Sequence, residues 1–314
     1  MNSTHTQLYN MCCILSTMII GVLGPEGSYS DKAAHLWLTQ ERIFSSLSKD
    51  MSIKYCDDII DTFDSVVTNT SDIGIVPVEN SIEGSVGVTL DLLMEHDIRI
   101  IGEVVVPIEH CLLSKGKLEN IRVILSHPQA LGQCRQFIKD HFPHAEIRTT
   151  GSTSHAAKLA TEFEEMAAIA SRESATMYGL NVLLCNIQDC NSNHTRFIVF
   201  RKKHEDDDLA WKTINGSVAE PAYTAKSDIP HRTSIIVYLD RDRPGALYDL
   251  LGEFASRKVN LTRIESRPSK RILGDYVFYI DFAGNISDTI IKDALNSILP
   301  KAGMMKVLGS YEMM

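Results

Sequence analysis

The sequence predicts an α/β protein that carries a second, C-terminal domain with the element order β-α-β-β-α-β. Strand-like and helix-like segments alternate from Ile19 to Phe200, which is typical of parallel sheets covered by helices. A second pattern begins after His231, and residues 202–230 between the two have little periodicity. At 314 residues the chain is too long for one typical core, so two or three folding units are expected.

The segments before residue 205 form two runs of the same kind. The first run predicts strands at 19–23, 53–56 and 73–78 and helices at 31–40 and 57–67. The second run predicts strands at 122–125, 146–149 and 167–170 and helices at 128–141 and 154–163. Other strand-like segments lie between and after the runs, at 98–106, 110–113, 181–184 and 197–201.

Residues 205–230 are interpreted as a linker, because the acidic run Glu205–Asp208 is followed by Gly, Ser, Pro and Ala. An acidic run of this kind is typical of a solvated segment rather than of a metal site. The elements after it are expected at 233–239 (strand), 244–258 (helix), 261–266 (strand), 275–282 (strand), 287–298 (helix) and 305–310 (strand). This is the ferredoxin-like order.

Composition excludes several functions. With 44% hydrophobic and 23% charged residues, the chain is typical of a globular protein in water, and no apolar run reaches the roughly 18 to 20 residues that span a bilayer. From His231 onward, twelve Lys/Arg and ten Asp/Glu give +2, so the total of -9 leaves -11 for residues 1–230. An acidic domain of this kind argues against nucleic-acid binding.

Neither the cysteines nor the N-terminus indicates secretion. The seven cysteines include no C-x-x-C pair, so they predict no disulfide framework and no zinc site, and a reducing cytoplasm fits best. Residues Met11–Leu15 resemble the apolar part of a signal peptide, but no Lys or Arg precedes them and no small-residue cleavage site follows. Residues 1–18 are therefore expected to be a weakly ordered extension, with Met18 as an alternative start.

The segment Asn193–Phe197 places a hydroxyl, a fixed cation and an aromatic ring next to each other at the start of a predicted strand. Alternation along a strand points Thr195 and Phe197 to one face and Arg196 to the other, so the three converge only at a cleft or bend. In isolation, Arg196 would be a surface residue between two core residues. The context consists of four further motifs, at Pro77–Ser81, Ser126–Gln133, Gly245–Leu247 and Glu265–Pro268.

In this order, the motifs resemble the prephenate dehydratase family with a C-terminal ACT regulatory domain, over roughly residues 19 to 311. The resemblance implies a two-lobed catalytic domain that looks like type II periplasmic binding proteins, with a returning C-terminal strand that completes the first lobe. It also implies a ferredoxin-like βαββαβ ACT domain. The expected boundaries are 1–18 for the extension, 19–204 for the catalytic domain, 205–230 for the linker and 231–314 for the ACT domain.

The same resemblance implies conversion of prephenate to phenylpyruvate, water and carbon dioxide in L-phenylalanine biosynthesis, with feedback inhibition by L-phenylalanine. It implies a homodimer or homotetramer in the cytoplasm, without a cofactor, a metal, a membrane or a nucleic-acid partner. Loss of carbon dioxide and hydroxyl makes the substrate ring aromatic, so the driving force lies in the substrate. The enzyme must orient the dianion, exclude water and help hydroxide to leave as water.

Thr195 is the leading candidate for the hydrogen bond to the departing hydroxyl, either directly or through a relayed water. Arg196 is expected to clamp a substrate carboxylate or to brace the site through backbone carbonyls, and Phe197 to form a cleft wall or part of the core. The resemblance also places further residues near the substrate, for each of which a turn or capping role is an alternative: Asn80, Ser81, Ser126, Gln133, Ser152 and Thr153.

In the C-terminal domain, the resemblance implies that L-phenylalanine is held at a dimer interface. The expected effector residues are Gly245, Ala246, Leu247, Asn260, Leu261, Glu265, Ser266, Arg267 and Pro268. Two rival functions remain at this stage. One is arogenate dehydratase, whose substrate differs by an amino group, and the other is a non-catalytic amino-acid sensor built from a cleft and an ACT module. Thr195 beside Arg196 favours an enzyme, because a sensor needs no hydroxyl at a leaving group.

Overall fold

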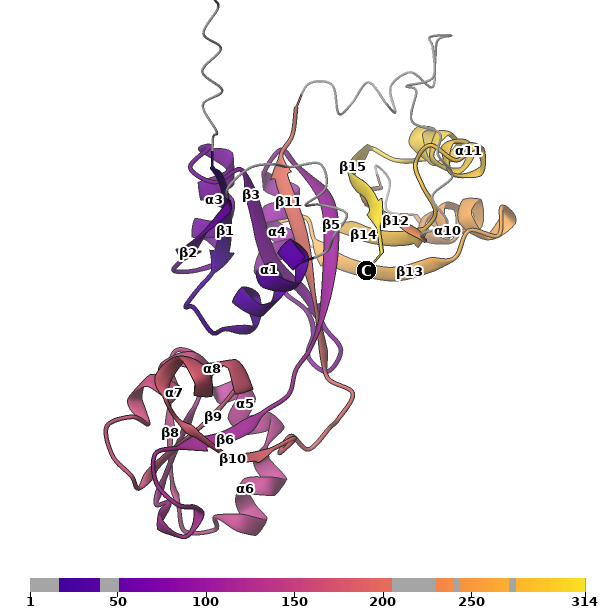
Figure 1. The fold of residues 1–314 in the computed structure, drawn as a ribbon. Coiled ribbons are helices and arrows are strands. Elements are labelled where there is room, and N and C mark those ends of the chain that lie inside the picture. The colour runs from indigo at the N-terminus through magenta and orange to yellow at the C-terminus, as the bar shows by residue number, and fades with distance from the viewer. Residues whose placement is uncertain (1–16, 40–50, 205–229, 240–242, 271–274, 314) are drawn as a thin grey trace, which may run out of the picture.

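The computed structural model describes residues 17–39, 51–204, 230–239, 243–270 and 275–313, and it arranges them around three sheets (Figure 1). Two sheets form a first and a second lobe, one above the other in the view, and the third forms a C-terminal domain beside the first lobe. This arrangement confirms the predicted α/β fold class. The expected extension at 1–18 and linker at 205–230 fall almost entirely outside the described residues.

The first lobe is built on a sheet with the order β2-β1-β3-β11-β5, to which β4 adds a short pairing with β3. Helix α1 packs on one face, and α3 and α4 pack on the other. The elements are β1 (Met18–Leu23), α1 (Tyr29–Thr39), β2 (Met51–Cys56), α3 (Ile59–Val67), β3 (Ile73–Asn80), β4 (Gly84–Ser85), α4 (Gly87–Glu95), β5 (Ile98–Pro107) and β11 (His194–Lys202).

Strand β11 returns from the second lobe and lies antiparallel between β3 and β5. Side chains alternate along a strand, so successive residues of β11 enter different cores. Phe197 and Val199 pack on the α1 side, whereas Ile198 and Phe200 pack on the side of α3 and α4. Thr195 and Arg196, which are successive residues at the start of β11, therefore face opposite sides of the sheet.

The second lobe contains a sheet with the order β10-β6-β9-β7-β8. Its elements are β6 (Cys111–Ser114), the 3₁₀ turn η1 (Leu118–Asn120), β7 (Val123–Ser126), α5 (Pro128–Gln133), α6 (Arg135–His141), β8 (Glu146–Thr149), α7 (Thr153–Leu159), β9 (Met166–Ala170), α8 (Arg172–Tyr178) and β10 (Asn181–Cys185). The single helix expected at 128–141 is broken at Cys134. The cause lies far along the chain, because the Asp189 carboxylate accepts from the backbone N–H of Gln136 at 3.1 Å and so caps a new helix start.

The C-terminal domain has the expected β-α-β-β-α-β order and a sheet arranged β13-β14-β12-β15. Its elements are β12 (His231–Tyr238), α10 (Ala246–Ser256), β13 (Leu261–Pro268), β14 (Tyr276–Ala283), α11 (Thr289–Ile298), the 3₁₀ turn η4 (Leu299–Lys301) and β15 (Met304–Glu312). Helices α10 and α11 cover one face of this sheet, and residues such as Ile235, Phe254 and Phe282 fill the core between them.

The opposite face of this sheet packs directly on the first lobe. Ile236, Tyr279 and Leu308 belong to the same buried cluster as Leu90 and Ile100 of that lobe. The contact is close, since a Cβ atom added to Gly309 would meet the Ile100 carbonyl oxygen at 2.2 Å. The C-terminal domain therefore shares a hydrophobic core with the first lobe, and burial of apolar surface holds the two together.

Polar contacts fix helix α4 of the first lobe to the C-terminal domain. The Lys306 ammonium donates to the carbonyls of Leu93, Met94 and His96 at 3.0, 3.3 and 2.6 Å, which satisfies the end of α4. Tyr279 donates its hydroxyl to the Leu90 carbonyl at 2.8 Å. The helix missed by the sequence prediction is thus an anchoring point for the C-terminal domain.

The two lobes also touch each other at the turn after β1. The hydroxyls of Ser171 and Ser174 both donate to the Gly27 carbonyl at 3.2 Å, and Lys32 pairs with Glu173 at 2.8 Å. The Gly24–Ser30 turn therefore contacts the second lobe. A search of the described residues finds no helix with the length and apolar character needed to span a membrane.

Candidate active site

Thr195 and Asn80 face each other across the antiparallel pair of β11 and β3, where the two strands leave the sheet. The Asn80 Nδ2 group donates to Thr195 Oγ1 at 2.9 Å and to Asn193 Oδ1 at 2.8 Å. The Asn80 Oδ1 atom accepts from the backbone N–H groups of Ile82 and Glu83 at 2.9 and 3.0 Å. All four hydrogen-bonding positions of this near-buried amide are engaged, so its orientation is fixed.

The network continues from the first lobe into the second. Asn193 donates through Nδ2 to Gln133 Oε1 at 3.0 Å, and His110 Nε2 lies 2.8 Å from the same oxygen. Gln133 then donates through Nε2 to Glu83 Oε1 at 3.2 Å. Residues from β3, α5 and both connections between the lobes therefore meet at one point. Most of them are neutral amides and hydroxyls, and Glu83 is the charged member.

His110 is a buried member of this network. Because Gln133 Oε1 can only accept, Nε2 of His110 must carry the proton. Desolvation lowers the pKa of His110 below its usual value, against a smaller opposing effect of the hydrogen bond to Gln133. The Tyr29 hydroxyl lies 3.4 Å from Nδ1 and donates to the Glu109 carbonyl at 2.5 Å. The site thus holds a neutral histidine in a fixed orientation.

The geometry leaves the proton of Thr195 available. A hydroxyl has one donor and two acceptor positions, and Asn80 occupies one acceptor position of Thr195 Oγ1. Within the described ranges, no acceptor is found for the Thr195 O–H group. A ligand in the cleft can therefore receive a hydrogen bond from Thr195, and the bond from Asn80 makes that hydroxyl a better donor through polarisation.

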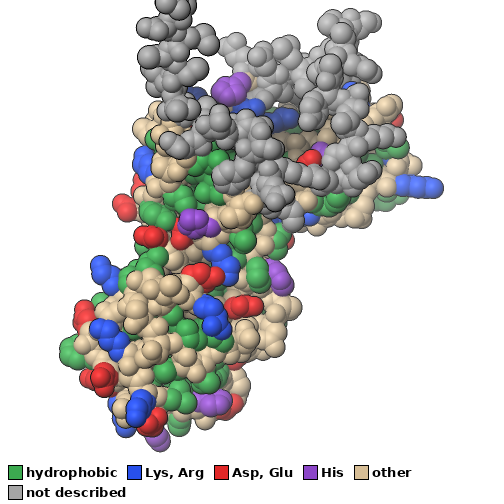
Figure 2. Space-filling view, in the orientation of Figure 1, with side chains coloured by type: hydrophobic (Ala, Val, Ile, Leu, Met, Phe, Trp, Pro, Cys, Tyr) green, Lys and Arg blue, Asp and Glu red, His purple; other side chains and the backbone are tan. Residues whose placement is uncertain are grey.

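A pocket of about 360 Å³ opens beside this network, which is within the usual size range for small-molecule sites. Glu83 and Gln133 belong to both the pocket wall and the network. The wall is formed by Ile82, Glu83, Gln129, Gly132, Gln133, Asp189 and Cys190. Figure 2 shows acidic and basic side chains interspersed over the second lobe on the face in view.

Three of the residues expected near the substrate make contacts within the protein. Ser126 is fully buried and donates to the Ile169 carbonyl at 2.6 Å, which ties β7 to β9 rather than lining the cleft. Phe197 is buried in the core under α1. Ser81 donates to the Ser192 carbonyl at 3.0 Å and accepts from the His194 N–H at 2.9 Å, so it holds the returning chain beside β3.

Ser152 and Thr153 lie at the start of α7. Ser152 is the N-cap and accepts from the His155 N–H at 3.0 Å, and Thr153 is the first helical residue. The next residue, Ser154, donates to the Glu26 carbonyl at 2.9 Å and so joins the two lobes. Capping therefore explains Ser152, and the helix start remains at the interface between the lobes.

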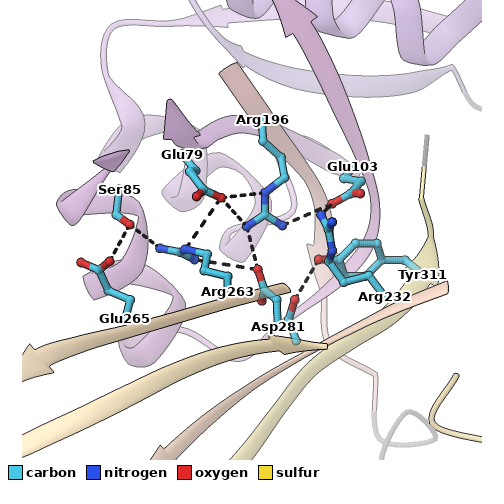
Figure 3. A network of polar contacts seen from close by, with 10 residues as sticks. Glu79, Ser85, Glu103, Arg196, Arg232, Arg263, Glu265, Asp281 and Tyr311 are labelled. Carbon is cyan, nitrogen blue, oxygen red and sulfur yellow. Dashed lines mark hydrogen bonds and ion pairs between the residues drawn. The ribbon is translucent and has the colours of Figure 1, made fainter. Parts of the chain in front are cut away.

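The carboxylate clamp expected of Arg196 is not what the structure shows. The Arg196 guanidinium points to the opposite face of the sheet from Thr195 and contacts three carboxylates, those of Glu79, Glu103 and Asp281 (Figure 3). The reason is the alternation of side chains along β11. Arg196 pairs in register with Glu79 just as Thr195 pairs with Asn80, and its guanidinium is held by side-chain carboxylates rather than by backbone carbonyls.

The expected effector residues divide between two faces of β13. Glu265 accepts from the Ser85 hydroxyl at 2.8 Å, and Arg267 pairs with Asp91 at 3.1 Å, so both side chains point to the first lobe. The alternate residues Ser266 and Pro268 are exposed, as is Asn260. Gly245 begins α10 with φ of 85°, a conformation that favours glycine, and Ala246, Leu247 and Leu261 are partly buried.

Sequence reasoning missed Asn193 and His110 as members of the site. Asn193 was part of the quoted motif, and its position just before the strand is the signal that could have indicated it. His110 carries no such signal, because its role depends on Gln133 and on the connection between the lobes. For metals, the described part of the chain contains no cluster of three His, Cys, Asp or Glu residues with suitable geometry.

Together, the fold and the site define a two-lobed α/β domain with a polar cleft, joined to a ferredoxin-like C-terminal domain. Residues 20–205 match the prephenate dehydratase family, and residues 233–300 match the ACT domain family. The chain belongs to the prephenate dehydratase family, since this match covers more than half of it. The first match covers the sheets of the two lobes, and the second covers most of the C-terminal domain.

Whole-chain relatives agree. A prephenate dehydratase of Methanocaldococcus jannaschii is 41% identical over 290 residues, which cover 91% of this chain and 95% of the relative. A crystal structure of prephenate dehydratase from Arthrobacter aurescens in complex with L-Phe is similar with a TM-score of 0.75 and 32% identity, covering 94% of this chain and 90% of that one. A structure described as a novel type of quorum quenching acylase has a TM-score of 0.76 and 26% identity, covering 94% and 98%.

Proposed function

We propose that this chain converts prephenate to phenylpyruvate, with L-phenylalanine as a feedback inhibitor. In the reaction, the bond from the ring to the carboxylate breaks, and its electron pair enters the ring as carbon dioxide leaves. The bond to the 4-hydroxyl breaks in the same process, and the hydroxide takes up a proton to leave as water. The ring becomes aromatic, so no external oxidant or reductant is involved.

The observation that carries this proposal is the Thr195–Asn80 pair. Asn80 donates to Thr195 Oγ1, and among the described residues the Thr195 O–H group has no acceptor, so it can donate to a bound substrate. A hydrogen bond to the departing hydroxyl grows stronger as negative charge develops on that oxygen, so it stabilises the transition state more than the bound substrate. The hydrogen-bonded amides of Asn193 and Gln133 hold this pair in place across the two lobes.

The test is ultraviolet detection of phenylpyruvate formed from prephenate by the purified chain, with arogenate assayed in parallel. The proposal expects phenylpyruvate from prephenate and little phenylalanine from arogenate. Faster release of phenylalanine from arogenate would instead make the chain an arogenate dehydratase. Absence of turnover with both substrates, together with measurable binding of an amino acid, would support a non-catalytic sensor.

L-Phenylalanine is proposed to bind between two copies of the C-terminal domain, which makes the chain a homo-oligomer. Two features support this. Strand β13 is an edge strand whose Ile264 side chain is 44% exposed, and Tyr248 on α10 is 79% exposed. These apolar groups and the Gly245 turn lie on the surface that a second copy would cover. A cytoplasmic location is also proposed, in agreement with the five described cysteines, which are all free thiols.

Gly245→Val tests the effector site. Valine is strained at φ of 85°, so the turn before α10 should change shape. We expect the phenylalanine concentration for half inhibition to rise by ~10-fold, while turnover without phenylalanine stays near that of the wild type. Dose-response curves of both proteins measure the change. Unaltered inhibition would place the effector away from this turn.

A further inference from the structure

Arg196 is the residue next to Thr195, and its guanidinium is held jointly by the first lobe and the C-terminal domain. Arg196 Nη2 lies 2.7 Å from Asp281 Oδ2 on β14 of the C-terminal domain. Its other contacts are within the first lobe, with Glu79 Oε2 at 3.1 Å and Glu103 Oε2 at 3.2 Å. Asp281 thus makes the shortest of these contacts, and it comes from a residue 85 positions away along the chain.

The ion cluster around Arg196 is balanced in charge, and all of its members except Glu79 are mostly buried. Three arginines (Arg196, Arg232 and Arg263) meet three carboxylates (Glu79, Glu103 and Asp281), as Figure 3 shows. Arg232 also contacts Glu103, and Arg263 lies 4.0 Å from Asp281 and 3.8 Å from Glu79. Each carboxylate therefore serves two arginines, so removal of any one leaves the others imperfectly paired.

Asp281 is held ionised in this cluster. The Asp281 side chain is 7% exposed, and burial alone would raise its pKa, but the charges of Arg196 and Arg263 outweigh burial and lower the pKa. Alternation along β14 explains its direction, since Val277, Tyr279 and Asp281 face the first lobe while Ile280 and Phe282 face the helices. The carboxylate is thus fixed by the same packing that joins the two domains.

The position of Arg196 constrains that of Thr195. Both lie at the beginning of β11, directly after the connection from the second lobe, and β11 has an irregular register with β3 between Arg196 and Phe197. The irregularity disrupts the ladder with β3 at this point, while the pairing of β11 with β5 stays in register from His194 to Val199. A guanidinium anchored in three directions adds a further constraint on the β3 side. A displacement of about 1 Å at a catalytic group can lower turnover by roughly 100-fold.

We propose that Asp281 of the C-terminal domain is a positioning residue for Thr195 and that it acts through the Arg196 guanidinium. The C-terminal domain then contributes to the geometry of the cleft even when no effector is bound. This inference rests on the proposed dehydratase activity, because its measure is the rate of that reaction. It concerns a contact within one chain and needs no second copy.

The test uses the full chain with Asp281→Asn, which keeps the shape of the side chain but removes its charge. We expect kcat on prephenate to fall by ~10-fold, with KM within about 2-fold of the wild-type value, because the geometry of Thr195 is altered and the pocket wall is not. Asp91→Asn is the matched control. It weakens two other ion pairs between the two domains, those of Asp91 with Arg267 and Lys270, and should leave basal kcat within about 2-fold.

A double-mutant cycle tests whether Asp281 acts through Arg196. In an Arg196→Met background, adding Asp281→Asn should cause no further loss of kcat, because the contact between Asp281 and the Arg196 guanidinium is already absent. Asp281→Glu keeps the charge and shifts the carboxylate by one methylene group, so it should show the same split between kcat and KM with a smaller loss. This variant serves as the measurement if Asp281→Asn does not fold.

Two results would overturn this inference but not the proposed function. One is wild-type kcat in a folded Asp281→Asn protein. The other is a decrease in kcat by the same factor when Asp281→Asn is added to the wild type and to the Arg196→Met variant. A wild-type chain that forms no phenylpyruvate from prephenate would overturn the proposed function and this inference with it. The wild-type measurement therefore distinguishes the two failures.

Discussion

The two faces of strand β11 differ in chemistry although their side chains are successive residues. On the cleft face, Thr195 meets Asn80 in a network composed mostly of neutral groups. On the opposite face, Arg196 meets Glu79 and Asp281 in a buried cluster of full charges. Neutral groups can donate a proton or a hydrogen bond without a large change in solvation, whereas paired charges fix geometry through strong and directional contacts.

This difference separates two tasks within one strand. The cleft face provides the hydroxyl that a ligand meets, and the charged face fixes the backbone from which that hydroxyl projects. A substitution on the charged face should therefore reduce stability and lower turnover only through the position of Thr195, whereas one on the cleft face should lower turnover directly. The following measurements test whether the two faces of β11 have these separate roles.

The largest expected effect belongs to the charged face. Arg196→Met leaves Glu79, Glu103 and Asp281 without their shared partner, and the loss of one member of a buried ion pair typically costs ~3 to 5 kcal/mol. Urea denaturation of the variant should show a decrease of that size in the free energy of unfolding. Arg148→Met is the control, because its ion pair with Glu146 is exposed and should contribute less than ~1 kcal/mol. Equal effects of the two substitutions would contradict a structural role for the cluster.

On the cleft face, Asn80→Asp exchanges a donor for an acceptor with almost no change in shape. The Thr195 hydroxyl would then donate to the introduced carboxylate instead of to a ligand, so we expect kcat to fall by ~10- to 100-fold. Steady-state kinetics with prephenate measure the loss. Asn181→Asp, at an exposed position on β10, adds the same charge in the second lobe and should leave kcat unchanged. Normal turnover in Asn80→Asp would mean that Thr195 needs no donor at this position.

A smaller effect is expected from pH. Burial lowers the pKa of His110 in the folded protein, whereas the unfolded chain titrates near the ordinary value of 6.5. As pH falls through 6.5, the unfolded state takes up a proton that the folded state does not, so stability decreases until pH reaches the lower folded pKa. Above 6.5 this contribution to stability is fully present.

His110→Asn keeps a donor near Gln133 but cannot be protonated. Between about pH 7 and about pH 5, we expect the free energy of unfolding of the wild type to decrease more steeply than that of the variant, by at most ~1.4 kcal/mol per pH unit. Urea denaturation over this range measures both slopes. Parallel curves would show that the protonation of His110 does not contribute to the pH dependence of stability.

Local patterns predicted most of the architecture. The alternation of apolar segments gave most strands and helices of both lobes, although not α4 or α8, and the order of the C-terminal domain, and the strand period alone placed Arg196 on the face opposite Thr195. Helix α4 was missed because it begins with Gly87 and lacks a side-chain cap. The break at Cys134 was missed because its cause, Asp189, is 53 residues from Gln136 along the chain.

The candidate site, like the fold, could be predicted only in part from local sequence patterns. The pairing of Thr195 with Asn80 follows the motifs, but the partners of Arg196 do not, since Asp281 belongs to another domain. No local sequence pattern indicates a contact between residues that are 85 positions apart along the chain. Ser126 shows the opposite error, because a serine beside the right motif is fully buried and bonded to a carbonyl. Residue type and order predict which elements approach the cleft, and packing determines which side chains reach it.

The central claim is that the Thr195 hydroxyl provides the hydrogen bond that the departing hydroxyl needs, and Thr195→Val tests it most directly. Valine keeps the branched shape and the volume of the side chain and removes only the hydroxyl. We expect kcat on prephenate to fall by at least ~100-fold with KM within about 3-fold, while Thr195→Ser, which keeps the hydroxyl, stays within about 10-fold of the wild type. A folded Thr195→Val protein with near-normal kcat would contradict the claim.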